Sequence, residues 1–228
     1  MAGLNAEVVR ANLASARERI ERAAARAGRD GGDVEILAAV KYLDAADIPT
    51  LADAGVTLVG ENRAHDLIEK AARAPGRLRW HFIGALQSRK VRLIVAHVEL
   101  IHSVASDSVL NELERHAPDG FEILVEVNVS GEPGKAGIAP RELDAFIARS
   151  PVKVVGLMTM PPQTDDPQQS RVHFAALGAL ARERELTTLS MGTSQDFEVA
   201  VEEGATIVRI GTILFAQRSP PGFGGTVR

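Results

Sequence analysis

Residues 34–41 read VEILAAVK, a short run of mostly apolar residues that ends at a lysine. Apolar side chains at consecutive positions over this length predict a strand buried on both faces, which is typical of parallel sheets. Lys41 follows directly, where a dinucleotide-binding fold would carry a glycine-rich phosphate loop. The stretch therefore favours a parallel α/β fold other than the open doubly wound sheet, which stays the alternative.

The same pattern recurs seven more times along the chain. Further short apolar runs lie at 57–60, 80–84, 100–103, 121–129, 153–158, 188–191 and 206–210. Between them lie segments with helical spacing, for example 46–54, 64–74, 89–96, 141–149, 171–184 and 196–203. Strands that alternate with helices imply right-handed crossovers and a parallel sheet, and eight such units can close. We predict an α/β fold that is a single (β/α)8 TIM barrel, with an extra N-terminal helix over 5–27.

The length fits one such barrel. The chain has 228 residues, close to the ~250 typical of this fold, so almost nothing is left for a second domain. We expect the barrel to occupy 1–218. The last ten residues, 219–228, are rich in glycine and proline and are expected to form a flexible tail.

Composition excludes several classes of protein. With 45% hydrophobic and 25% charged residues the chain resembles an average globular domain. A net charge of −4 with dispersed basic residues argues against binding to nucleic acid. The absence of cysteine excludes thiolate metal sites and fits a reducing, cytoplasmic setting. No apolar run reaches the ~18 residues that a membrane span needs, and no signal-peptide core is evident. The histidines have no paired ligand spacing, so no metal site is predicted.

Lys41 is the first candidate for chemistry, since active sites of such barrels lie at the carboxyl ends of the strands. At an apolar barrel mouth an ammonium loses hydration and its pKa falls, so the neutral amine can form a Schiff base with an aldehyde. The alternative is a lysine that simply extends to solvent. Position alone leaves the two interpretations balanced.

Two loops near the end of the chain suit an anion. The stretch 190–196, SMGTSQD, offers hydroxyls and a glycine just before a helix, where amide groups favour phosphate. An ordinary capping turn with Ser194 is the alternative. The stretch 209–212, RIGT, follows the last strand, and barrels often bind phosphate with the loops after strands seven and eight. Together the loops favour a phosphate site. His81, within an apolar strand, is expected to be a hydrogen-bonded core residue.

Several motifs in this order resemble a known family, the pyridoxal-phosphate homeostasis proteins, which are single barrels of the alanine-racemase N-terminal type. The motifs are GEN at 60–62, WHFIG at 80–84 with LQS at 86–88 and Lys90, NVS at 128–130 with Lys135 and Gly137, GLMTM at 156–160, SMG at 190–192 with Ser194 and Asp196, and RIGT at 209–212 with Phe215. The resemblance spans roughly 5–218, and the order and spacing of the motifs are specific.

The resemblance implies a cofactor, pyridoxal 5′-phosphate, and a set of residues that bind it. The Schiff-base lysine falls on Lys41, and the phosphate contacts fall on Ser194, Gly211 and Thr212. Gly192 and Thr193 line the same loop, Asn62 lies at the edge of the cofactor, and Arg209 faces the pyridine nitrogen. A cation there disfavours protonation of the ring and makes the cofactor a poorer electron sink. The sequence departs from the family pattern at Val40, Tyr42, Thr193 and Ala216, and these departures affect the packing around the ring.

The implied function is intracellular pyridoxal-phosphate homeostasis: reversible binding, then buffering or delivery through transient contact with apo-enzymes, without robust catalysis. A monomer is expected because one barrel supplies the whole site. The first alternative is an amino-acid racemase or decarboxylase. A racemase needs a second base on the opposite face of its substrate, and the one tyrosine, Tyr42, adjoins Lys41, so that base has no obvious source. The second alternative is a Schiff-base aldolase that acts on a phosphosugar.

Overall fold

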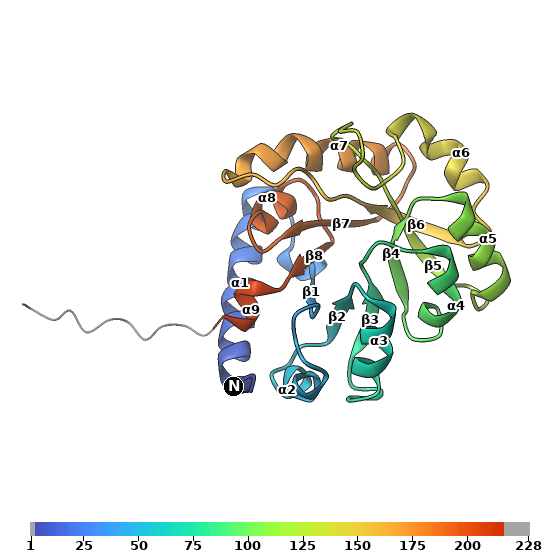
Figure 1. Ribbon diagram of the computed structural model, residues 1–228. Helices are drawn as coiled ribbons and strands as arrows, with labels where there is room; N and C mark the ends of the chain where they lie inside the picture. The colour runs from blue at the N-terminus through green and yellow to red at the C-terminus, as the bar shows by residue number, and fades with distance from the viewer. Residues whose placement is uncertain (1–2, 217–228) are drawn as a thin grey trace, which may run out of the picture.

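The computed structural model describes residues 3–216 and shows a closed barrel of eight strands in sequence order, each paired in parallel with its neighbours (Figure 1). The predicted (β/α)8 barrel is therefore confirmed, and the open doubly wound sheet is excluded. The tail predicted at 219–228 lies outside the described residues, so the predicted boundary at 218 stays a prediction.

All eight strands lie where the apolar runs predicted them, with ends that differ by a few residues. They are β1 Glu35–Ala39, β2 Leu58–Glu61, β3 Arg79–Phe82, β4 Leu100–Val104, β5 Glu122–Glu126, β6 Lys153–Met158, β7 Thr188–Thr193 and β8 Ile207–Ile210. The largest difference is at β5, which ends at Glu126 although the apolar run continues to position 129. Beyond β5 the chain leaves the ladder, with an isolated bridge between Val127 and Ile138.

The helices surround the barrel. They are α1 Ala6–Arg26, α2 Ile48–Asp53, α3 Ala64–Ala71, α4 Val91–Ile94, α5 Asp107–His116, α6 Leu143–Ala148, α7 Arg171–Arg182, α8 Phe197–Glu202 and α9 Thr212–Phe215. Three of the predicted helical segments begin as a 3-10 turn before α2, α4 and α6. No bounds were predicted for α5, and α9 was not predicted because its four residues are too few for a periodic pattern.

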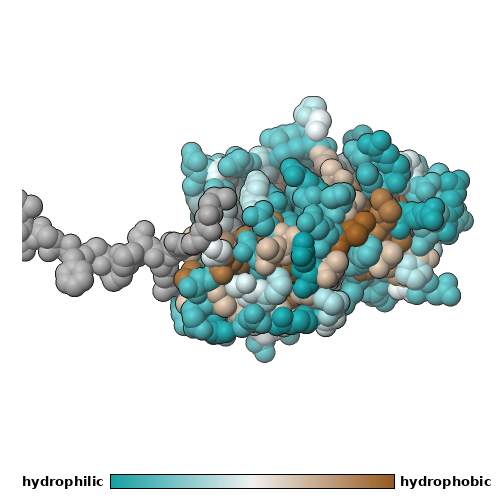
Figure 2. All heavy atoms as spheres, turned by 60° about the horizontal axis from the view of Figure 1, so that its bottom comes forward, coloured by the Kyte–Doolittle hydropathy of each residue, from teal (hydrophilic) through white to brown (hydrophobic). Residues whose placement is uncertain are grey.

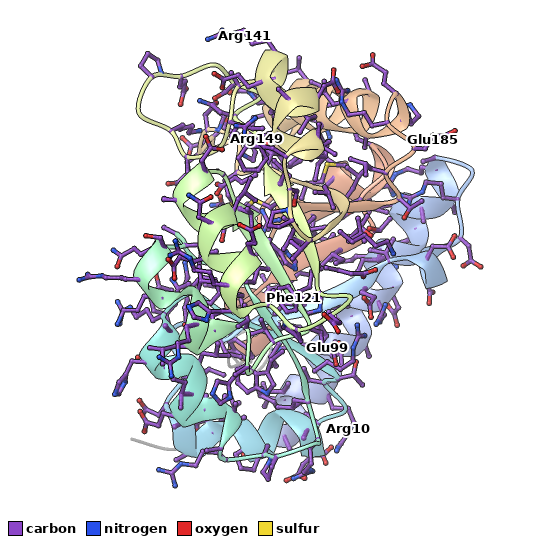
Figure 3. The ribbon with its side chains drawn as sticks, turned by 90° about the vertical axis from the view of Figure 1, so that its right-hand side faces the viewer. Arg10, Glu99, Phe121, Arg141, Arg149 and Glu185 are labelled. Atoms are coloured by element: carbon purple, nitrogen blue, oxygen red, sulfur yellow. The ribbon has the colours of Figure 1, made fainter. Side chains whose placement is uncertain are left out.

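Two apolar layers hold the barrel together. Inside it, side chains from six of the strands form a cluster that consists of Leu37, Leu58, Leu100, Leu124, Met158 and Ile207. Outside it, a larger cluster joins the strands to the helices. The amino ends of the strands carry charges instead, where Arg79 pairs with Glu35 at 2.6 Å and Glu99 at 2.8 Å. Glu99 and Phe121, labelled in Figure 3, directly precede the paired residues Leu100 and Glu122 at this end.

The N-terminal helix α1 lies against α8 and α9, as Figure 1 shows. It begins at Ala6, and the side chain of the preceding Asn5 caps it by accepting hydrogen bonds from the amides of Glu7 and Val8. Its buried Asn12 donates hydrogen bonds to the carbonyls of Leu214 at 3.0 Å and Ala216 at 2.9 Å. The helix thereby fixes the segment that follows the last strand, where part of the predicted site lies.

The surface is mainly polar. On the face turned forward in Figure 2, hydrophilic residues predominate and hydrophobic ones show in patches between them. Among the described residues, no helix is both long and apolar enough to span a bilayer.

Candidate functional site

Lys41 lies in a turn two residues beyond the end of β1, not directly at the strand end. Its side chain is exposed, and Nζ lies 4.8 Å from the ring centroid of Tyr42, which is itself 80% exposed. The ammonium is thus solvated and rests on an aromatic face. The loss of hydration that we expected at an apolar mouth is not observed, because the side chain turns onto Tyr42.

Asn62 follows β2 directly and is placed by its neighbour Glu61. The buried Glu61 carboxylate accepts hydrogen bonds from the amides of Asn62 at 2.6 Å and Arg63 at 3.1 Å. The side-chain Oδ1 of Asn62 is buried without a hydrogen-bond partner. An unsatisfied buried oxygen costs free energy, so a donor from a bound ligand would stabilise it.

A buried cation holds the ends of β1 and β2 together. Lys70, on α3, donates from Nζ to Glu61 Oε2 at 2.5 Å and to the carbonyl of Val40 at 2.8 Å. Val40 directly precedes Lys41, and the register pairs Ala39 with Gly60, so the two strand ends lie side by side. Lys41 and Asn62 therefore project from one fixed corner of the barrel.

The loops after β7 and β8 are joined through Ser194. Its Oγ accepts a hydrogen bond of 3.2 Å from the amide of Gly211, in the other loop. The capping-turn alternative required Ser194 to accept an amide of the following helix, and this is not observed. Asp196 fixes the first loop instead, since its Oδ1 accepts from the amide of Thr193 at 2.7 Å and from the Thr193 hydroxyl at 3.0 Å. The Thr193 hydroxyl is therefore engaged within its own loop.

The two glycines of the predicted cradle have different structural roles. Gly192 has a φ of +89°, and a Cβ there would lie 2.5 Å from Ala200 Cβ, so this glycine lets α8 pack on the loop. Gly211 approaches the end of β1, where a Cβ would lie 3.1 Å from the carbonyl oxygen of Ala39. Its backbone thus connects the last loop to the strand that leads to Lys41.

Thr212 and Arg209 occupy opposite environments. Thr212 is exposed and begins α9, where the first amides of a helix have no intrahelical acceptor. Arg209 is only 5% exposed and points into the barrel, where burial lowers its pKa to about 10. Its guanidinium therefore keeps a full positive charge at neutral pH.

The topology brings the predicted residues onto four neighbouring strands, since β7, β8, β1 and β2 are consecutive around the barrel. Ser194, Gly211 and the end of β1 form one connected surface. Lys41 is the exception, because its amine lies over Tyr42 rather than against these loops.

The polar interior beneath the loops was not predicted from the sequence. His81 Nδ1 and His102 Nε2 lie 2.9 Å apart, and His102 Nδ1 lies 2.8 Å from Ser190 Oγ. His81 is thus a hydrogen-bonded core residue, as expected. Glu126 is also buried there, and burial raises its pKa. The signal available in the sequence was the alternation of side chains between the two faces of a strand. Leu100 is the register partner of His81, and His102, two residues further along β4, lies on the same face of the strand as Leu100.

The closed parallel barrel, the lysine after its first strand and the two linked polar loops after its last strands place the chain among the (β/α)8 barrel proteins with a candidate phosphate site. The family model described as alanine racemase, N-terminal domain, matches residues 11–219. The chain belongs to this family.

The comparisons also confirm the resemblance to the pyridoxal-phosphate homeostasis proteins. The pyridoxal phosphate homeostasis protein of Aquifex aeolicus is 41% identical over 215 residues, which cover 88% of this chain and 94% of the relative. The structure of PipY from Synechococcus elongatus without PLP is 32% identical, covers 91% of this chain and 100% of PipY, and has a TM-score of 0.79. A second structure of PipY, with PLP bound and the same coverage, has a TM-score of 0.75.

Proposed function

We propose that this chain binds pyridoxal 5′-phosphate and serves in its homeostasis. The observation that carries the proposal is the link between Ser194 and Gly211, which joins the last two loops and places them against the end of β1. The solved relative PipY supports it, since that protein of the same fold has PLP bound.

The residues present fit this cofactor. Ser194, Gly211 and Thr212 would hold the phosphate, with hydroxyl and amide donors that suit an anion. The unpartnered Oδ1 of Asn62 would accept from a donor of the cofactor, such as its ring hydroxyl. When bound, the group supplies an aldehyde that reacts reversibly with a primary amine. Lys41 would supply that amine after it turns from Tyr42 toward the loops.

Arg209 supports a carrier rather than a catalyst. A permanent cation opposite the pyridine nitrogen disfavours its protonation, and an unprotonated ring withdraws electrons poorly. Tyr42, the one tyrosine, lies beside Lys41 and does not offer a base on the opposite side. We therefore expect no robust catalysis. We further propose that the protein is a cytoplasmic monomer that passes the cofactor to apo-enzymes by transient contact.

The test is spectroscopic. Purified protein saturated with pyridoxal phosphate is expected to absorb in the visible range and to lose this band on borohydride reduction. Mass spectrometry of the reduced protein is expected to place the label on Lys41. Lys41→Ala should abolish the band, while Lys153→Ala, which removes an exposed lysine at the opposite end of the barrel, should retain it. A label on another lysine, or none after saturation, contradicts the proposal.

Catalysis is the competing function. The loaded protein is to be incubated with a panel of L- and D-amino acids, and racemisation and decarboxylation are measured. We expect no turnover above that of free cofactor. Turnover at ordinary enzyme rates, about 1 to 1000 per second, would overturn the carrier interpretation.

A further inference from the structure

The buried guanidinium of Arg209 is held by groups from two other strands. Nη1 donates to Ser190 Oγ on β7 at 2.6 Å. Nη2 donates to the carbonyl of Thr159, just after β6, at 2.9 Å, and lies 2.8 Å from Met160 Sδ. Of these three partners, Ser190 leads on to the side chains of two further strands.

That set crosses the interior of the barrel. Ser190 Oγ lies 2.8 Å from His102 Nδ1 on β4, and His102 Nε2 lies 2.9 Å from His81 Nδ1 on β3. Ser190 and His102 are fully buried and His81 is 2% exposed. His102 and Ser190, 88 positions apart in the sequence, are thus hydrogen-bonded to each other. Four side chains from four strands form one chain of hydrogen bonds that starts at Arg209.

The chemistry of the end group gives the chain a direction. A guanidinium has donors only, so Ser190 Oγ accepts from Arg209 and its single proton is left for His102 Nδ1. A neutral imidazole that accepts at Nδ1 carries its proton at Nε2, so His102 donates to Nδ1 of His81. His81 then carries its own proton at Nε2. The opposite direction would leave the buried Ser190 hydroxyl without an acceptor, which is unfavourable for a buried donor.

The surroundings keep both histidines neutral. Burial lowers the pKa of His81 to about 3, with a smaller effect of Arg79. Burial also holds the pKa of His102 well below its ordinary value, and the nearby His81 and Arg209 add to this. The charged groups that act on Arg209 in turn are Glu126 and Asp196.

We propose that Ser190, His102 and His81 are positioning residues that hold Arg209 in place through this one-way chain of hydrogen bonds. The inference rests on the proposed function in one respect, namely that Arg209 faces the ring nitrogen of the cofactor. With its proton directed to His102, Ser190 Oγ keeps both lone pairs as acceptors, and one of them accepts from Arg209. The guanidinium is thereby fixed where it keeps the ring nitrogen unprotonated.

The direction is tested in the protein without cofactor. Two-bond ¹H–¹⁵N correlation spectra of histidine-labelled protein are expected to show the Nε2–H tautomer for both His81 and His102 at pH 7. The exposed His65 provides a reference resonance in the same spectrum. An Nδ1–H tautomer at either residue, or a mixture of tautomers, would overturn the inference whether or not the cofactor binds.

The positioning role is tested with variants of the loaded protein. Ser190→Ala removes the acceptor for Arg209. His102→Phe removes the acceptor for the Ser190 hydroxyl. Both are expected to change the pH dependence of the absorption spectrum and to weaken cofactor binding about ten-fold, as expected for one hydrogen bond to a charged group. His102→Asn places an amide oxygen near the position of Nδ1 and is expected to restore the wild-type spectrum.

Ser103→Ala is the matched control. Ser103 neighbours His102 on β4, is also buried and donates to the carbonyl of Gly84 at 2.5 Å, outside the chain of hydrogen bonds. Its loss is expected to lower stability without changing the spectrum. The same spectral change in Ser103→Ala, or wild-type spectra in Ser190→Ala and His102→Phe, would reduce the role to packing. Failure of wild-type protein to bind the cofactor would count against the proposed function, and the tautomers would still decide the direction.

Discussion

The ammonium of Lys70 lies 2.5 Å from Oε2 of Glu61, and both side chains are buried. Through its second hydrogen bond, to the carbonyl of Val40, the same ammonium fixes the backbone just before Lys41. The carboxylate fixes the backbone of Asn62 with its other oxygen. One buried ion pair therefore sets the relative position of two residues of the candidate site.

Removing Lys70 should be costly. Lys70→Met leaves the Glu61 carboxylate buried without a countercharge, and the free energy of unfolding should fall by about 3–5 kcal/mol. Urea denaturation measures this change. Lys153→Met, which removes a partner of an exposed pair with Glu122, should cost at most about 1 kcal/mol. Equal losses in the two variants would show that the buried pair contributes no more to the free energy of unfolding than the exposed pair does.

The phosphate loops predict a second effect. Ser194→Ala and Thr212→Ala each remove a hydroxyl donor to an anion, which should weaken retention of pyridoxal phosphate about ten-fold or more. Equilibrium dialysis measures the affinity, and circular dichroism should show folded protein. Ser108→Ala removes an exposed hydroxyl on α5 and should bind as wild type does. Unchanged affinity in both loop variants would exclude these loops as the phosphate site.

Gly192 offers a test of packing rather than binding. Gly192→Ala combines a φ of +89° with a Cβ 2.5 Å from Ala200 Cβ, so we expect a loss of about 2–4 kcal/mol in the free energy of unfolding. Gly131→Ala shares the positive φ but meets no atom within 4 Å, and should cost only about 1–2 kcal/mol. Denaturant titration compares the two variants. A loss no greater than that of Gly131→Ala would mean that α8 shifts freely.

The barrel could be predicted from sequence because each of its strands is a local pattern. A buried parallel strand is a continuous apolar run, so 34–40 and its seven counterparts were visible one at a time. Ends were less certain, as at β5, because apolar residues also pack in the loop beyond Glu126. The resemblance to a family then supplied the roles of the site residues, which spacing alone left open.

The polar interior could not be predicted because its partners are distant in sequence. His102 and Ser190 are separated by 88 positions, and no local pattern records that they meet across the barrel. Lys70 lies in the predicted helical segment 64–74, and no local pattern shows that its ammonium reaches the carbonyl of Val40. The direction in which Lys41 turns depends on a side-chain contact with Tyr42, which strand periodicity does not determine.

The buried histidines predict how stability depends on pH. Both have pKa values below the ordinary 6.5, so below that pH the unfolded chain binds protons that the folded chain does not. Stability should therefore be complete above pH 6.5 and should fall toward pH 3, by up to about 1.4 kcal/mol per pH unit for each histidine.

Urea denaturation between pH 7.5 and 5 measures this slope. His102→Asn should make it shallower, because one of the two groups is removed. Glu126, whose pKa is raised by burial, acts with the opposite sign: above its ordinary 4.5 the folded chain holds a proton that the unfolded chain has lost, so this group reduces the slope at the acid end of the range. The same slope in wild type and in His102→Asn would show that His102 takes up its proton in the folded protein as it does in the unfolded chain.

Tyr42 predicts a kinetic effect on covalent attachment of the cofactor. The contact between Lys41 Nζ and the Tyr42 ring must break before the amine can turn toward the loops, and an exposed contact of this kind is worth about 0.5–1 kcal/mol. Tyr42→Leu should therefore speed attachment about two- to five-fold, as followed by stopped-flow absorbance. Tyr42→Phe keeps the aromatic face and should react at the wild-type rate. If Tyr42→Phe accelerates as much as Tyr42→Leu, the hydroxyl rather than the ring restrains Lys41, and if neither changes the rate, the lysine leaves the ring without cost.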